Sequence, residues 1–549
     1  MTTGFPASSN AQLQRYLRDV EAALRSNNMA KATRLSDEAV ALGFEHSNLL
    51  VLAAHHQLST GAADRALAIA MRARAASPRN VDVLNVLGLS LTALKRGREA
   101  IAAYDAALRQ SPTTVAVRFN RACTLEDLHE LARARTEYER ILEQQPTHAG
   151  ALARLAHLAV QRGDLGVART LAGRTLQQDA NQQAAHLAIA QADVEEKKFG
   201  EALARLQPLT RSADIGAVNL SIAQGLTGDA LEGLGRTADA FAAYSASQAT
   251  LRANYEPTFR ASGAESARNR VTRLTGYFET DATLRWRNTV DEYDSPVRGH
   301  IFLVGFPRSG TTLLEQVFAG HPDVESMEER DCLIDAANDF ILPADGLDRL
   351  SALEAAELKR YRNHYWQRAA AEGASLAKPF YLDKMPLNSI LLGVVAKLFP
   401  RAKILFALRD PRDVVLSCFR RRFVITPQMF ELTTLEGAAD YYVAVMRLCE
   451  AYRRTLNLEL LDTRYEDLVT DFDAQCRRLC AFVQLDWTES MRGFADRARA
   501  GLIGTPSAPQ VARGLFTQGI GQWRKYRNEL APVLPELAPW VARFGYSAD

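Results

Sequence analysis

The sequence has few cysteines and no long apolar run. Its 549 residues include six cysteines, with no CxxC pair and no neighbouring histidine, which predicts reduced thiols rather than metal ligands or disulfides. No stretch approaches the roughly 18 consecutive apolar residues that span a bilayer. The first dozen residues lack the basic start and apolar core of a secretion signal. We therefore expect a cytoplasmic protein with no membrane partner.

Net charge is also almost absent. Lys and Arg number 66 against 64 Asp and Glu, which gives a formal net charge of +2. Without a global positive field we expect no nucleic-acid partner, and any anion site must be local. Hydrophobic residues make up 47% and charged residues 24%, which are ordinary globular values. The length predicts at least two domains.

The first half of the chain repeats every 34 residues. Small residues occupy two fixed positions in each repeat, as expected where paired antiparallel helices approach closely. Proline follows three of the repeats, where it would end the second helix. The first series is Ala32, Ala66, Ala100, Ala134, Ala168 and Ala202, and the second, twelve residues earlier, is Val20, Ala54, Gly88, Ala122, Ala156 and Ala190. The prolines are Pro78, Pro112 and Pro146.

This pattern resembles the tetratricopeptide repeat and predicts an all-α solenoid over residues 12–252. A further unit at Gly228, Ala240 and Tyr244 is displaced by four residues, which we assign to the segment near residues 210–218. We expect about seven repeats, followed by a helical connector over 253–297. The solenoid would bind a peptide or acceptor, or act as a spacer or dimerisation platform; homodimerisation is left open.

A phosphate-binding pattern opens the second half. An apolar run, Ile301 to Val304, leads through a turn into a helical run that begins at Thr311. Gly305 and Gly310 bracket four residues, as in a P-loop, where glycines let backbone N–H groups surround phosphate oxygens. The lysine of a nucleotide triphosphatase loop is absent and Arg308 lies inside the loop instead. A nucleotide kinase-like phosphotransferase is therefore disfavoured.

A second strand and helix follow about a hundred residues later. The apolar run ends before Arg409, and the next helix carries Ser417 and Arg421 one turn apart. These three side chains would converge on a second phosphate through charge-assisted hydrogen bonds. Asp410 and Asp413 are expected to cap the helix or orient the arginines.

Together these motifs resemble the sulfotransferase fold, which transfers a sulfuryl group from 3′-phosphoadenosine 5′-phosphosulfate (PAPS), and the tyrosylprotein sulfotransferases in particular. The resemblance implies an α/β, P-loop-like domain with a parallel sheet over 298–549. It implies catalytic roles for Glu329, Arg308 and Lys384. It further implies donor binding by Pro307, Arg308, Ser309, Gly310, Thr311, Thr312, Arg409, Ser417, Arg421, Tyr465 and Ser507.

The same resemblance implies a mechanism without a metal. Glu329 would take the proton of the acceptor hydroxyl, with PAPS as donor and the bisphosphate PAP as product. Glu328 remains an alternative base. His321 is a further alternative that we expect to cap or pack instead.

The acceptor is less well defined. The chain resembles bacterial tetratricopeptide-repeat sulfotransferases, but it carries Arg330 and Asp331 where the tyrosylprotein family has Thr-Arg. A protein or peptide hydroxyl is favoured over a glycan or a small molecule. A repeat scaffold with a non-catalytic nucleotide-binding domain is the alternative outside enzymes.

Overall fold

The structure is a computed structural model of the chain. It describes residues 7–94, 96–128, 130–260, 263, 265–280, 286, 293–500, 511–512 and 514–549. The chain divides into two compact units: residues up to 159 with 166–180, and residues 160–165 with 181–549. Among the described residues, no helix combines the length and the apolar composition needed to cross a lipid bilayer.

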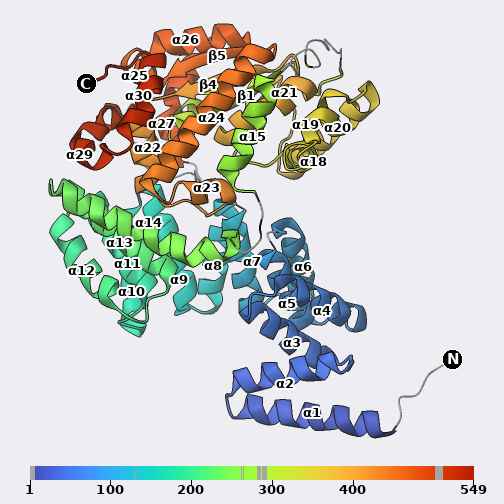
Figure 1. Cartoon of the computed structure of the whole chain (residues 1–549). Helices are drawn as coiled ribbons and strands as arrows, with labels where there is room; N and C mark the ends of the chain where they lie inside the picture. Colours follow the sequence, from blue (N-terminus) through green and yellow to red (C-terminus); the bar gives the residue numbers. More distant parts are fainter. Residues whose placement is uncertain are drawn as a thin grey trace. The chain divides into compact units, whose positions relative to one another are not determined.

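Helices α1 to α14 form seven consecutive pairs, which Figure 1 colours from blue to green. From α3 to α13 the first helix of each pair begins 34 residues after the previous one. The pairs are α1 (Ala7–Arg25) and α2 (Met29–Ala41), α3 (Ser47–Ser59) and α4 (Ala63–Ala76), α5 (Val81–Ala93) and α6 (Gly97–Gln110), α7 (Val115–Asp127) and α8 (Leu131–Gln144), α9 (Ala149–Arg162) and α10 (Leu165–Gln178), α11 (Gln183–Glu195) and α12 (Phe199–Arg211), and α13 (Ala217–Gly233) and α14 (Thr237–Arg260).

The small repeat positions lie where the helices pack. All six alanines of the first series are fully buried. A Cβ atom on Gly88 would lie 2.4 Å from the ring of Tyr104, and one on Gly228 would lie 2.5 Å from the ring of Tyr244. A larger side chain has no room at either position, which is the reason for the pattern.

The displacement of the last repeat takes the form of a longer helix. Helix α13 begins in frame at Ala217, so the loop before it is not lengthened. Instead α13 has 17 residues where α11 has 13. The four additional residues form one more helical turn and delay the start of α14.

The C-terminal domain contains a five-stranded parallel sheet in the order β2-β3-β1-β4-β5. The predicted α/β class with a parallel sheet is confirmed. The strands are β1 (Gly299–Gly305), β2 (Val324–Glu328), β3 (Phe380–Lys384), β4 (Lys403–Leu408) and β5 (Glu459–Arg464).

Helices surround this sheet. They are α15 (Ala267–Glu279), α17 (Thr311–Phe318), α18 (Ile334–Phe340), α19 (Gly346–Ser351), α20 (Ala355–Ala371), α21 (Leu392–Leu398), α22 (Pro411–Arg420), α23 (Pro427–Glu431), α24 (Leu435–Thr455), α25 (Tyr465–Thr470), α26 (Phe472–Val483), α27 (Phe494–Ala500), α29 (Arg527–Leu530) and α30 (Leu534–Arg543). Short 3₁₀ turns cover Pro386–Leu391, Glu489–Gly493, Thr517–Gly519 and Gln522–Tyr526.

Two apolar cores lie on the two faces of the sheet. Alternate residues of β1 point to opposite faces, so Phe302 and Val304 join one core while Ile301 and Leu303 join the other. The first core also contains Leu231 of α13 and the residues Ala240 and Tyr244 of α14. The last repeat pair therefore shares a core with the sheet. The boundaries at residues 252 and 297 stay predictions from the repeat pattern, since the compact units divide elsewhere.

Candidate active site

The loop after β1 has the backbone geometry of an anion cradle. Gly305 has φ +155°, and a Cβ atom there would lie 2.6 Å from the carbonyl oxygen of Ala407. Gly310 has φ +97°, and its Cβ would lie 2.8 Å from the ring of Tyr465. Between them Arg308 adopts the left-handed region, φ +71°, which a non-glycine residue rarely occupies. Helix α17 begins directly after this loop, and helix N-termini favour anions.

Guanidinium groups gather beside this loop. The Nε of Arg308 donates to Ser417 Oγ at 3.0 Å, which ties the loop to α22. Arg409 follows β4 and donates to the carbonyl oxygens of Arg308 at 3.2 Å and Gly519 at 2.6 Å. Burial and the charges of Arg421 and Arg409 lower the pKa of Arg308 to about 9. The cations repel one another, so a bound polyanion would be stabilised here.

Tyr465 lies next to the same loop. It follows β5 and donates its hydroxyl to the Phe516 carbonyl oxygen at 2.6 Å, while the guanidinium of Arg409 lies 5.0 Å from its ring centroid. The other predicted loop residues, Pro307, Ser309, Thr311 and Thr312, are buried. Ser507 lies outside the described residues.

A buried lysine forms the second part of the site. Lys384 is the last residue of β3 and is fully buried. Its Nζ donates to Glu329 Oε1 at 2.7 Å and lies 3.3 Å from Glu315 Oε2 and 3.8 Å from Glu328 Oε1. Three carboxyl groups therefore converge on one ammonium group.

Strand pairing explains this convergence. Glu328 is paired with Lys384 in the β2 and β3 register. The next residue, Glu329, turns back at φ +42° and donates its N–H to the Lys384 carbonyl oxygen at 2.8 Å. The side chain of Glu329 is 36% exposed against 26% for Glu328. Of these two candidate bases, Glu329 is thus both nearer to Lys384 and more accessible.

Glu315 was not identified from the sequence. It lies on α17 within an apolar run, and its side chain is almost completely buried. Burial raises its pKa to about 8, although the neighbouring Lys384 opposes this shift. Burial disfavours the charge of Lys384 as well, but Glu315, Glu329 and Glu328 together raise its pKa above the ordinary value. A polar residue on the apolar face of a short helix was the available signal.

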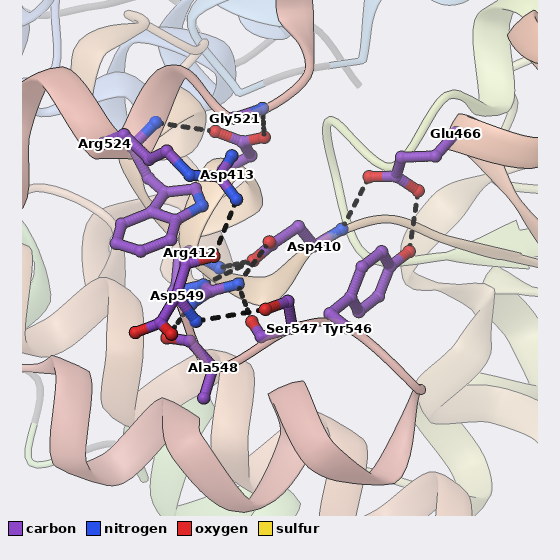
Figure 2. A network of polar contacts seen from close by, with 11 residues as sticks. Asp410, Arg412, Asp413, Glu466, Gly521, Arg524, Tyr546, Ser547, Ala548 and Asp549 are labelled. Atoms are coloured by element: carbon purple, nitrogen blue, oxygen red, sulfur yellow. Dashed lines mark hydrogen bonds and ion pairs between the residues drawn. The ribbon is translucent and has the colours of Figure 1, made fainter.

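A network of polar contacts surrounds the start of α22 (Figure 2). Asp410 accepts hydrogen bonds from the N–H of Arg412 at 2.9 Å and from its guanidinium at 2.7 and 3.0 Å. Asp413 accepts from the backbone N–H groups of Gly521 and Trp523 at 2.7 and 2.8 Å. Burial raises the pKa of Asp413 to about 6. Asp410 thus caps α22 and orients Arg412, as expected, whereas Asp413 holds the backbone of residues 521–523 instead of an arginine.

The same network reaches the C-terminal residues. Arg412 donates to the carbonyl oxygens of Ser547 and Ala548 at 2.7 and 3.0 Å. Glu466 accepts from the N–H of Asp410 at 3.1 Å and from the Tyr546 hydroxyl at 2.7 Å (Figure 2). Residues 546–548 therefore help to fix the loop between β4 and α22.

His321 is held by hydrogen bonds at both ring nitrogens. Its Nε2 donates to the Asp486 carbonyl oxygen at 2.9 Å and its Nδ1 accepts from the Asp323 N–H at 3.1 Å. The ring is 3% exposed. Both ring nitrogens are engaged, as the expectation that His321 caps or packs requires.

The two parts of the site lie at one edge of the sheet. Gly305, Glu328, Lys384, Leu408 and Arg464 end their parallel strands there. Ligands of open α/β sheets bind at this edge, beyond the carboxyl ends of the strands. The described residues contain no cluster of three or more His, Cys, Asp or Glu side chains arranged to hold a metal ion.

Family models match segments in both halves of the chain. Residues 300–489 match the family model of the sulfotransferase family, and residues 51–113 and 119–185 match the tetratricopeptide repeat. The sulfotransferase domain of the olefin synthase of Synechococcus PCC 7002 has a TM-score of 0.31 and 23% identity, covering 43% of this chain and 91% of that domain.

Two curated relatives match the C-terminal half. An uncharacterized protein of Aquifex aeolicus (strain VF5) is 26% identical over 257 residues, 44% of this chain and 33% of that protein. A protein-tyrosine sulfotransferase of Drosophila melanogaster is 25% identical over 264 residues, 45% of this chain and 51% of that protein. The chain spans about a third to a half of the length of these relatives. It carries a domain of the sulfotransferase family, preceded by tetratricopeptide repeats.

Proposed function

We propose that the chain is a PAPS-dependent sulfotransferase that transfers a sulfuryl group to an acceptor hydroxyl. The observation that carries the proposal is that a phosphate-binding loop and a lysine–glutamate pair lie at the same edge of the sheet. The glycine loop and the arginines around Arg308 suit phosphate groups, and the cluster of Lys384 with Glu329 suits proton transfer. The site fits a phosphate group, because the buried Nε of Arg409 has no hydrogen-bond partner among the described residues.

The proposed residues have separate roles. Glu329 takes the proton of the acceptor hydroxyl while the acceptor oxygen bonds to sulfur, a contribution of typically ~10² to 10⁴ in rate. The bond between sulfur and the phosphate oxygen breaks, and PAP leaves. Lys384 and Arg308 stabilise charge on the transferred group and on the leaving phosphate, assisted by hydroxyls of Ser309 and Thr312. Arg409, Ser417 and Arg421 hold the second phosphate.

Nucleotide binding can be tested without knowing the acceptor. Isothermal titration of the full chain should show PAP binding well above ATP. Arg308→Ala and Arg409→Ala should each weaken PAP by about 1.5 to 3 kcal/mol, or roughly tenfold to 150-fold, through loss of one charge-assisted contact. The matched control is Arg74→Ala, because Arg74 is an exposed residue of α4. ATP binding equal to or tighter than PAP binding contradicts the proposal.

Turnover tests the base. Glu329→Gln should keep PAP affinity and lose most transfer from radiolabelled PAPS, because Glu329 acts on the acceptor. Glu357→Gln, at an exposed position of α20, is the control. Near-normal transfer in Glu329→Gln with a loss in Glu328→Gln would assign the base to Glu328.

The acceptor that we favour is a protein or peptide hydroxyl. The Drosophila relative is described as a protein-tyrosine sulfotransferase, and repeat solenoids commonly bind peptides. Mass spectrometry of host proteins and glycans incubated with PAPS and the full chain would identify it. If sulfate appears on glycans and not on peptides, the acceptor is a glycan and the protein acceptor is ruled out. A metal-free reaction, a cytoplasmic location and a homodimer stay predictions from the sequence.

A further inference from the structure

The C-terminal end of α22 meets the last repeat pair. Three consecutive arginines, Arg420, Arg421 and Arg422, end this helix and begin the following loop. Helices α13 and α14 present carboxylates, a tyrosine and an amide to this segment. All of these residues belong to the same compact unit.

Two carboxylates of α13 pair with two of the arginines. Asp229 Oδ2 lies 3.4 Å from Arg421 Nη1, and Glu232 accepts from Arg420 Nη2. The hydroxyl of Tyr244 donates to Asp229 at 2.9 Å, and the guanidinium of Arg420 lies 5.0 Å from the Tyr244 ring centroid. The tyrosine thereby fixes the orientation of the Asp229 carboxylate toward α22.

Helix α14 also holds the backbone of this segment. The side-chain amide of Gln248 donates to the carbonyl oxygens of Phe419 at 2.6 Å and Arg421 at 3.0 Å. Gln248 is 3% exposed. Carbonyls at a helix C-terminus lack partners within the helix, so this buried amide satisfies two of them and determines where the chain leaves α22.

Arg421 links these contacts to the phosphate loop. Its positive charge lies close enough to Arg308 to lower the pKa of that residue. Its side chain is 35% exposed and only one of its nitrogens contacts Asp229. Other N–H groups of the same guanidinium can therefore reach an anion while the carboxylate holds it from behind.

We propose that Asp229 and Gln248, which lie in the last repeat pair, are positioning residues of the nucleotide site and hold Arg421 for the second phosphate of PAP. This inference rests on the proposed function, because it takes Arg421 as a ligand of that phosphate. It adds that part of the repeat array completes the donor site. The repeats then contribute to donor selection as well as to any choice of acceptor.

A purely structural role makes a different prediction. Ion pairs that only join helices would affect every nucleotide equally when they are removed. A positioning role affects PAP, which has the second phosphate, but not adenosine 5′-phosphate, which lacks it. The ratio of the two affinities therefore separates the alternatives.

The experiment is isothermal titration of the full chain with PAP and with adenosine 5′-phosphate. Asp229→Asn and Gln248→Leu should each weaken PAP about tenfold and change adenosine 5′-phosphate less than threefold. Asp239→Asn is the control, because this exposed acid of α14 pairs with Arg236 and not with α22. Tyr244→Phe, which removes the hydrogen bond to Asp229, should weaken PAP in the same direction and provides an independent variant if Asp229→Asn does not fold.

A double-mutant cycle completes the test. The variant Asp229→Asn with Arg421→Ala should bind PAP no more weakly than Arg421→Ala alone. Equal losses for both nucleotides, unchanged PAP binding, or tighter PAP binding in Asp229→Asn would overturn the inference. If the unaltered chain does not prefer PAP to adenosine 5′-phosphate, the proposed nucleotide site itself fails, which is a distinct result.

Discussion

Replacing Glu315 by glutamine should make the stability of the C-terminal domain less dependent on pH between pH 5 and 8. Glu315 is buried beside Lys384, and burial raises its pKa from 4.5 to about 8. The folded domain therefore keeps a proton that the unfolded chain has released. The contribution of Glu315 to the free energy of unfolding is fully present below pH 4.5. It is lost as the pH rises from 4.5 through 8.

The size of the pH dependence follows from the one proton that the unfolded chain releases and the folded domain keeps. The free energy of unfolding should fall by up to about 1.4 kcal/mol per pH unit in this window. Glutamine has nearly the shape of the neutral acid and does not titrate. The variant should match the unaltered chain near pH 5 and become progressively more stable than it as the pH rises toward 8.

Other titrating groups are common to both proteins and cancel in the comparison. Burial raises the pKa of Asp383 to about 7 and that of Asp413 to about 6, so both act in the same direction as Glu315. Burial lowers the pKa of His300 to about 3, so this residue makes the folded domain less stable as the pH falls below 6.5. Lys384 stays charged throughout the window, since its pKa is raised.

Urea unfolding followed by tryptophan fluorescence measures this difference in the correct domain. All five tryptophans lie in the C-terminal half: Trp286, Trp366, Trp487, Trp523 and Trp540. Glu357→Gln, at an exposed site on α20, should show no change with pH relative to the unaltered chain. A stability difference for Glu315→Gln that is constant from pH 5 to 8 refutes the reasoning. A variant that is most destabilised at pH 8 means that Glu315 is ionised and paired with Lys384.

Two further predictions concern packing and the C-terminal network. Gly228→Ala should cost about 1 to 3 kcal/mol in thermal unfolding, because its Cβ would lie 2.5 Å from the ring of Tyr244. Gly200→Ala, with no atom within 4 Å, should be neutral or stabilising, and equal effects would refute the packing argument. Arg412→Ala should cost about 3 to 5 kcal/mol, since it leaves a buried carboxylate unpaired. Arg492→Ala breaks an exposed pair that solvent screens and should leave stability nearly unchanged in the same urea assay.

Much of the architecture could be predicted from the sequence, since it repeats. A fixed distance between buried alanines requires a fixed helix length and a fixed turn, and the helix starts keep that spacing up to α13. The position of the displacement could not be derived in this way. An additional helical turn and a longer loop shift later residues equally, and only the structure distinguishes them.

The site was predictable where its residues follow strands. Arg409 comes directly after the apolar strand β4 and Arg308 lies in the loop that follows β1, and a parallel sheet brings such positions to one edge. Lys384 was named only through the family resemblance. Glu315 was missed, although it stands within an apolar helical run, because a polar residue within an amphipathic helix is normally exposed. The pair of Asp229 and Arg421 spans 192 residues, and no local pattern encodes a contact of that separation.

The contacts of α13 and α14 with the C-terminal domain make the last repeat pair different in kind from the others. The added residues of α13 precede Gly228, which is already displaced, whereas Asp229 and Glu232 in the last part of the helix pair with the arginines at the end of α22. A repeat array usually gains or loses whole units during evolution without loss of fold, because each unit contacts only its neighbours. Here that freedom should extend to the earlier pairs alone. The pair α13 and α14 must be inherited together with the sulfotransferase domain, whose core and arginine segment it shares.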